Sequence, residues 1–240
     1  EAFWLTTVLN DHLAGVGNTF LGLVGMQPQA RPWADFVTLQ IAVVAVIVVV
    51  FALLKPRLSA DRPGVFQHLF EVVYTFLRGE SQGQVGEHGP NYLPYFGTIF
   101  FFILFANLIG TFPTFESPTM FPSVPLGCAL ATFGYYNLMG LKAQGAWSYM
   151  KHFAGPMPLL APLMIPIEII SHLARPLSLT IRLFANMYAG EQVFLVFLSL
   201  TYFLVPAMFM GLHVFVAFLQ AYIFTLLTMM YVGGAVANDH

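Results

Sequence analysis

The sequence predicts an all-α polytopic membrane protein with about five transmembrane helices, the fourth long and steeply tilted, plus one interfacial helix. Composition carries this fold class, because 58% of the 240 residues are hydrophobic and only 8% are Asp, Glu, Lys or Arg. A typical soluble domain is roughly a quarter charged, and a chain of this size cannot hide so much apolar surface behind so few charges. Nine Lys and Arg against eleven Asp and Glu leave no basic surface for nucleic acid. The single cysteine, Cys128, excludes an internal disulfide.

Four segments precede the carboxyl-terminal part of the predicted single membrane domain, residues 1–240. Residues 1–34 mix polar residues and glycines with moderate hydrophobicity, which indicates a periplasmic or interfacial segment. The runs 36–54, 95–112 and 120–141 each provide about the 20 apolar residues that a bilayer span needs. We find no internal repeat and no separate soluble domain.

An amphipathic segment separates the first two predicted spans. Residues 65–78 place apolar side chains at helical spacing and also carry His68, Glu71 and Arg78. This pattern predicts a helix lying along the membrane interface.

Basic residues set the expected orientation. They are concentrated in the loops after the first and third spans, whereas the loop 113–119 carries only one charge, that of Glu116. By the positive-inside rule the basic loops face the cytoplasm, and the amino terminus lies outside. Five crossings put the carboxyl terminus in the cytoplasm, whereas six would put it outside. The basic residues in question are Lys55, Arg57, Arg62, Arg78, Lys142 and Lys151.

The apolar run 159–200 is too long for one upright span. Its length of about 42 residues corresponds to roughly 63 Å of helix, about twice the hydrocarbon thickness. The run is either two spans with a turn near Arg182 or one steeply tilted helix. The absence of a Gly, Asn or Pro turn cluster near Arg182 favours the tilted helix, which forms a long hairpin with the last span, 202–232.

Charged residues interrupt the first helix of this hairpin. A charge at the bilayer centre costs about 2.5–3.5 kcal/mol, so such residues indicate a functional site. At 100° per residue, Glu168, Arg175 and Arg182 nearly share one face, and Asn186 lies one turn beyond Arg182. Glu191 is nine residues past Arg182 and therefore points to the opposite face.

The last helix carries a matching polar stripe. His213, Gln220 and Tyr231 are separated by seven and eleven residues, which places them on one face. Arg182 keeps its proton even when desolvated, whereas Glu191 and His213 are groups that exchange protons. One fixed cation among titratable groups is the layout expected of a gated proton path.

Structural explanations compete at two positions. Arg175 precedes Pro176 and can be a snorkelling arginine at a helix end. His172 lies one turn from Glu168 and can simply hydrogen-bond to it. This pair lacks the third ligand of most zinc sites, so we expect no metal and no cofactor.

One stretch of the hairpin resembles a known family. Residues 176–191, Pro-Leu-Ser-Leu-Thr-Ile-Arg-Leu-Phe-Ala-Asn-Met-Tyr-Ala-Gly-Glu, resemble the signature of subunit a of the F-type ATP synthase, the stationary proton-channel subunit of its membrane sector. The segment from His213 to Gln220 and beyond looks like the end of that family's last helix. Upstream, the resemblance rests on span order and on the pair Asn107-Leu108.

The resemblance implies a non-catalytic bacterial subunit that couples proton flow to ring rotation and ATP synthesis. Arg182 would face the ring of c subunits and separate two offset half-channels, and Glu191 and His213 would line the periplasmic one. Some bacterial relatives carry an aspartate after the Asn-Leu pair, which this chain lacks; either Glu116 takes its place here or no residue does. The other implied proton-translocating residues are Asn186 and Gln220 near the arginine, and Glu168, Ser171 and Tyr231 toward the cytoplasmic exit.

The same resemblance implies the partners and the location. The partners are the c-subunit ring, the b-subunit peripheral stalk, other ATP synthase subunits, membrane lipid and protons. The location is the bacterial inner membrane, with the amino terminus periplasmic and the carboxyl terminus cytoplasmic.

Two other classes of protein can also hold buried polar residues of this kind. An ion-coupled secondary transporter uses them, but such folds commonly show internal repeats. A haem-binding redox subunit would need His172 and His213 as axial ligands and should show a visible absorption band.

Overall fold

The computed structural model describes residues 4–23, 25, 27–59, 64–112, 115–145, 161–201 and 204–236. Every regular element in these ranges is helical, which confirms the predicted fold class. The α-helices are α1 (Trp4–Leu23), α2 (Asp35–Leu54), α3 (Val65–Val85), α4 (Leu93–Ile109), α5 (Ser123–Gln144), α7 (Ala161–Leu200) and α8 (Leu204–Val236). Short 3-10 helices lie at η1 (Lys55–Arg57), η2 (Gly89–Tyr92) and η3 (Pro118–Met120).

Four helices among the described residues are long and apolar enough to cross a membrane. They are Asp35–Leu54, Gly89–Ile109, Met164–Leu200 and Val205–Val236, which correspond to the predicted first, second, fourth and fifth spans. Only 17% of the most apolar stretch of α2 is buried inside the structure, as is typical of a helix whose outer surface contacts lipid.

The predicted span 120–141 corresponds to α5, which is a helix but is not among these four. It begins later than predicted, at Ser123, because residues 118–120 form the separate turn η3. Polar and small residues such as Thr132 and Asn137 lower its mean hydropathy. A membrane crossing by α5 stays a prediction.

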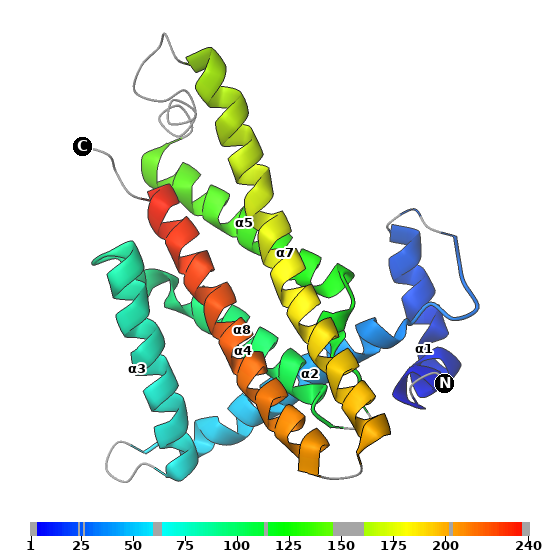
Figure 1. The fold of residues 1–240 in the computed structure, drawn as a ribbon. Coiled ribbons are helices and arrows are strands. Elements are labelled where there is room, and N and C mark those ends of the chain that lie inside the picture. The colour runs from blue at the N-terminus through cyan, green and yellow to red at the C-terminus, as the bar shows by residue number, and fades with distance from the viewer. Residues whose placement is uncertain are drawn as a thin grey trace.

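The long apolar run is one helix. α7 extends unbroken for 40 residues, or about 60 Å, so the prediction of one long helix is confirmed and the alternative of a turn near Arg182 is wrong. Residues 159–160 and 202–203, at the edges of the predicted hairpin, lie outside the described residues. In Figure 1, α2 runs across both α7 and α8. The steep tilt of the hairpin in the membrane stays a prediction.

The core is formed around α8, which contacts α3, α4, α5 and α7. α7 packs on this core through Leu179, Leu183 and Met187, which are fully buried and spaced four residues apart. This spacing places them along one stripe of the helix. The angle between a polar residue of α7 and this stripe therefore determines whether its side chain faces the core or the outside.

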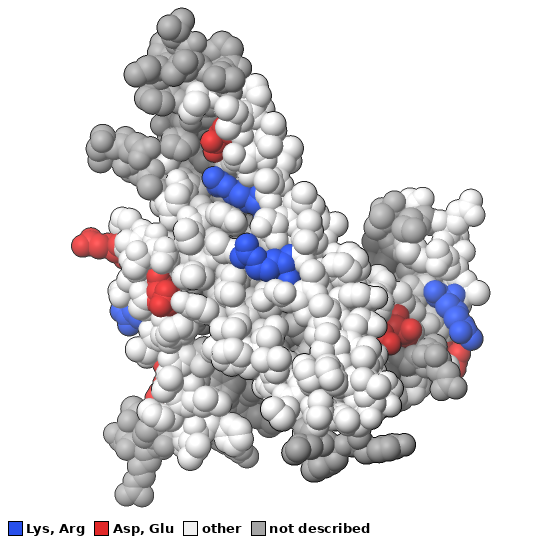
Figure 2. Space-filling model, in the orientation of Figure 1, with Lys and Arg blue, Asp and Glu red and all other residues white. Residues whose placement is uncertain are grey.

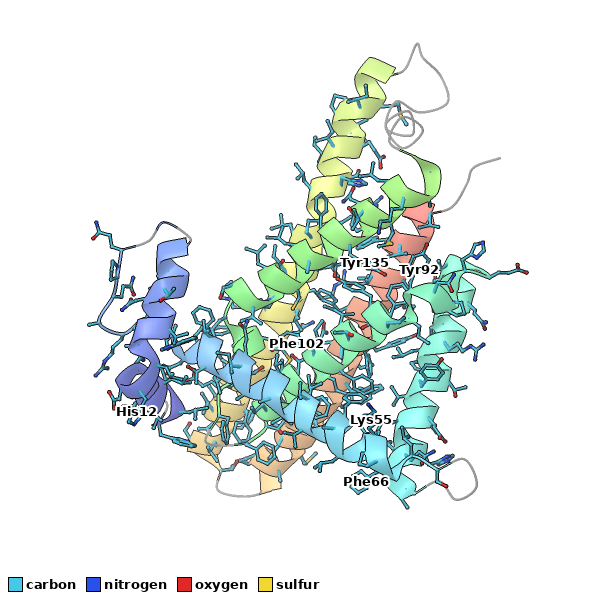
Figure 3. The ribbon with its side chains drawn as sticks, turned by 180° about the vertical axis from the view of Figure 1, so that it is seen from behind. His12, Lys55, Phe66, Tyr92, Phe102 and Tyr135 are labelled. Carbon is cyan, nitrogen blue, oxygen red and sulfur yellow. The ribbon has the colours of Figure 1, made fainter. Side chains whose placement is uncertain are left out.

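The predicted amphipathic helix is present as α3 and extends seven residues beyond the predicted end, to Val85. Its side chains at Val65 and Phe66 are strongly exposed. Figures 1 and 3 place α3 and α1 on opposite sides of the bundle; Lys55 and Phe66 mark the α3 side and His12 the α1 side.

The amino-terminal segment folds back on itself through two asparagines. The Asn10 side chain donates to the carbonyl of Trp33 and accepts from its N–H, both at 3.0 Å. Asn18 makes the same pair of bonds with Gln29, at 3.1 and 2.9 Å. α1 is thus tied to the connection, residues 27–34, that leads into α2, and it is not among the helices apolar enough to span.

Candidate functional site

The candidate site is built on the antiparallel pair of helices α7 and α8. Two contacts fix their register. A Cβ atom on Gly190 would lie 2.7 Å from Nδ1 of His213, and the guanidinium carbon of Arg175 lies 5.2 Å from the centre of the Tyr231 ring. Arg182 is eight residues from Gly190 and seven from Arg175, so it lies midway between these two contacts.

Arg182 has no hydrogen-bond or ion-pair partner among the described residues. It is half-buried and lies 21 residues from the first residue of α7 and 18 from the last. It sits on the flank of the helix, beside the buried stripe. In Figure 2 an acidic group lies beside the upper basic group over α7, whereas uncharged surface surrounds the lower one. A cation so placed needs a counter-charge that this part of the chain does not supply.

Asn186 on α7 and Gln220 on α8 each lie within about one helical turn of the level of Arg182. Asn186 is exposed one turn beyond Arg182 on α7. Gln220 is 7% exposed and lies within one turn of the α8 residues level with Arg182, given the register of the hairpin. The structure therefore brings both amides to the level of the arginine.

Glu191 and His213 line the same small cavity. The cavity measures about 20 Å³ and its other lining residues are Gly110, Thr111, Phe194 and Met210. Glu191 Oε2 and His213 Nε2 are buried and have no hydrogen-bond partner in the described part of the chain. Buried polar atoms without partners are costly, and a cavity of this size holds about one water. The geometry thus provides two proton-exchanging groups around a water-sized space.

A second carboxylate acts on this end of the hairpin. Glu116 is exposed in the connection before η3, and its charge interacts with that of Glu191. Of the two alternatives left by the sequence, the position of Glu116 is compatible with the one in which Glu116 takes the place of an acid near the cavity.

A second polar cluster lies at the other end of α7. Glu168 Oε1 is 3.9 Å from Nη2 of Arg175 and 3.8 Å from Nδ1 of His172. His172 Nε2 is 3.3 Å from Oδ1 of Asn137 on α5, and Arg175 lies against the ring of Tyr231. The hydrogen bond expected between His172 and Glu168 is not formed: the two atoms lie 3.8 Å apart, at ion-pair distance. Glu168 is 14 residues, or about 21 Å, from Arg182.

Ser171 is exposed on α7. None of the contacts described for this cluster involves it. Among the residues that the structure describes, no group of three His, Cys, Asp or Glu side chains could hold a metal ion.

The haem alternative is wrong on geometry. His213 lies opposite Gly190, and Gly190 is 18 residues from His172 along α7. That separation is about 27 Å, so the two imidazoles cannot bind the two faces of one haem.

The sequence analysis gave no part in these sites to three residues that shape them. Gly190 gives the His213 ring its space, because any side chain there would collide with it. Asn107, fully buried on α4, donates to the Ala217 carbonyl of α8 at 3.1 Å and accepts from Thr119 Oγ1 at 2.7 Å. Tyr136 on α5 contacts Arg175 next to the Tyr231 ring of the hairpin partner. Two signals in the sequence could have pointed to them. Gly190 directly precedes the intramembrane acid Glu191, and Tyr136 directly precedes Asn137, a polar residue in an apolar run.

Comparison with known proteins gives a consistent result. The family described as ATP synthase A chain matches residues 37–233. The chain is 70% identical to ATP synthase subunit a of Solibacter usitatus over 97% of its own length and 100% of the relative's. It is 44% identical to ATP synthase subunit a of Koribacter versatilis over 99% and 98% of the two chains. With ATP synthase subunit a of Aquifex aeolicus the identity is 37%, over 82% of this chain and 95% of the relative.

Proposed function

This chain belongs to the ATP synthase A chain family, and from that premise we propose that its α7–α8 hairpin forms two proton half-channels separated by Arg182. The coarser role follows from membership: the chain is a multi-pass membrane subunit of ATP synthase, works with other subunits of that complex, and is not itself catalytic. Because the chain belongs to this family, we no longer consider the alternative that it is an ion-coupled secondary transporter.

One observation carries the proposal: Arg182 is an unpaired cation, among the described residues, at the middle of an apolar 40-residue helix. Its counter-charge is a carboxylate on the ring of c subunits. Small exposed residues on the same flank, Ser178 and Ala185, support this partner because small side chains let another helix approach closely.

The two polar sites lie on either side of Arg182 and serve opposite aqueous spaces. The cavity of Glu191 and His213 is the periplasmic half-channel, about 13 Å along α7 from Arg182. Glu168, with Ser171 and Tyr231, belongs to the cytoplasmic half-channel. Asn186 and Gln220, level with the arginine, orient it or line the route to it.

The transport cycle follows from the cost of buried charge. A proton from the periplasmic half-channel neutralises a ring carboxylate, which can then face lipid without an ionic penalty. Rotation brings the carboxyl group to the cytoplasmic half-channel, where it ionises beside Arg182. Each charge moved gains about 2.3 kcal/mol per 100 mV of membrane potential. Arg182 blocks a direct proton leak because a guanidinium does not release its proton.

Contacts between helix ends define two groups of ends, one on each side of the bundle. This arrangement supports a five-crossing topology in the bacterial inner membrane. Phe36, at the start of α2, packs on Phe121 before α5, with ring centroids 5.6 Å apart. At the other side, Gln144 at the end of α5 donates to the Ala235 carbonyl near the end of α8 at 3.2 Å. α5 therefore runs from one group to the other, as a crossing helix would. The first group is periplasmic, with residues 1–34, and the second is cytoplasmic, with the carboxyl terminus and the b-subunit stalk.

Cross-linking tests which flank of α7 faces the ring. In the assembled complex, Ser178→Cys should form a disulfide with a cysteine placed one turn from the ring carboxylate, because Ser178 lies one turn before Arg182. Leu177→Cys is the matched control: it lies at the same depth and is 57% exposed, but it is rotated by 100° from Ser178. Equal or greater cross-linking from Leu177→Cys would contradict the proposed ring-facing flank.

Cysteine labelling tests the orientation. In a Cys128→Ala background, a membrane-impermeant maleimide should label Glu116→Cys in intact cells stripped of their outer membrane. It should label Glu87→Cys, exposed after α3, only in inverted vesicles. The opposite pattern for this pair would overturn the periplasmic assignment of the amino terminus.

A further inference from the structure

Arg175 lies against two neighbouring aromatic rings that come from different helices. Its guanidinium carbon is 5.9 Å from the ring centre of Tyr136 on α5 and 5.2 Å from that of Tyr231 on α8. Both distances are within the range of cation–π attraction, which strengthens when the groups are desolvated. Tyr136 is 1% exposed, so its ring is a fixed part of the core.

The carboxylate beside Arg175 does not by itself fix the arginine. The shortest ion-pair distance to Glu168 is 3.9 Å, beyond hydrogen-bond length. Both side chains are one-third exposed, and an arginine with that freedom has many rotamers. The contacts with the rings of Tyr136 and Tyr231 therefore favour one rotamer of Arg175 over the others.

Tyr136 occupies the centre of this cluster. Its ring meets the His172 imidazole edge to face at 5.4 Å and lies 5.9 Å from the Tyr231 ring. It thus touches Arg175 and His172, the two side chains that flank Glu168.

We propose that Tyr136 is a positioning residue of the cytoplasmic half-channel, whose ring holds Arg175 beside Glu168. The inference rests on the proposed role of Glu168 in proton exit. With Arg175 held, the carboxylate keeps one electrostatic environment as protons pass. Without the ring, Arg175 can turn toward lipid headgroups or solvent and leave Glu168 without its neighbouring cation.

A double-mutant cycle in the assembled ATP synthase tests this role. The readout is ATP-driven proton pumping in inverted vesicles, per assembled complex. Tyr136→Phe keeps the ring face and should stay within about twofold of the unaltered enzyme. Tyr136→Met removes the ring and should lower the rate about tenfold. In an Arg175→Gln background, Tyr136→Met should cause no further loss.

Tyr135→Met is the matched control on the same helix. Tyr135 stacks on Tyr95 with ring centroids 3.7 Å apart and lies near Tyr92 (Figure 3); it makes no contact with Arg175. Its replacement should act equally with and without Arg175→Gln.

Three results would overturn the inference. A further tenfold loss from Tyr136→Met in the Arg175→Gln background would show a packing role, and so would loss of assembly in Tyr136→Met. A rate for Tyr136→Phe as low as that for Tyr136→Met would show that the ring face is not what matters. Arg182→Ala tests the proton path independently: normal pumping there would remove the proposed function, whereas additivity in the Tyr136 cycle removes only this inference.

Discussion

An assembled ATP synthase carrying Arg182→Ala should neither synthesise ATP from a proton gradient nor pump protons with ATP. The loss should be at least about a hundredfold, the effect of removing one preorganised electrostatic group from a dry site. Arg182 is unpaired among the described residues and lies at mid-helix, so alanine removes the only fixed charge between the two polar sites. ATP synthesis and pumping are measured in vesicles, with assembly checked by recovery of the complete complex.

The same replacement should open a passive proton leak, because nothing then blocks transfer from one half-channel to the other. Arg182→Lys should also fail, since a desolvated ammonium can lose its proton whereas a guanidinium cannot. Arg31→Ala, in the amino-terminal segment far from the hairpin, is a control that should leave both rates unchanged. Near-normal proton-coupled synthesis by Arg182→Ala would refute the role given to this residue.

Properties set by local sequence were predictable from the residues alone. The unbroken helix α7 follows from the length of its apolar run and the lack of a turn cluster near Arg182. The shared flank of Arg175 and Arg182, and the opposite placement of Glu191, follow from 100° per residue. α3 was predictable for the same reason, because its apolar residues recur at helical spacing.

Properties that depend on helix packing were not predictable in this way. Tyr136 reaches Arg175 from a helix 39 residues upstream, and Asn107 bonds to a carbonyl 110 residues away. No periodicity within one helix encodes which residue of the next helix lies opposite. The role of Gly190 likewise appears only once the register places His213 against it. The start of α5 was misjudged because a 3-10 turn and two prolines continue the apolar run without continuing the helix.

Glu191 and His213 should each be needed for transport, and exchanging them should restore part of what either single change loses. Both line one water-sized cavity, and each has a buried atom without a partner among the described residues. Glu191→Ala or His213→Ala should lower ATP-driven proton uptake about ten- to hundredfold, because acid–base groups contribute on that scale or more. The exchange Glu191→His with His213→Glu keeps one carboxyl and one imidazole around the same water, so uptake should recover severalfold relative to Glu191→His or His213→Glu alone.

The cavity itself supplies the control for disturbed packing. Phe194 and Met210 also line it, and exchanging these two apolar residues alters its shape on the same two helices without touching a titratable group. That exchange should change uptake by less than about threefold, since repacking that conserves total volume is usually tolerated. Recovery in the Glu191–His213 exchange, beside a mild effect of the Phe194–Met210 exchange, requires the two polar residues to act on one shared proton site. Multiplicative losses with no recovery would mean that they act separately, and a single periplasmic site formed by both would have to be abandoned.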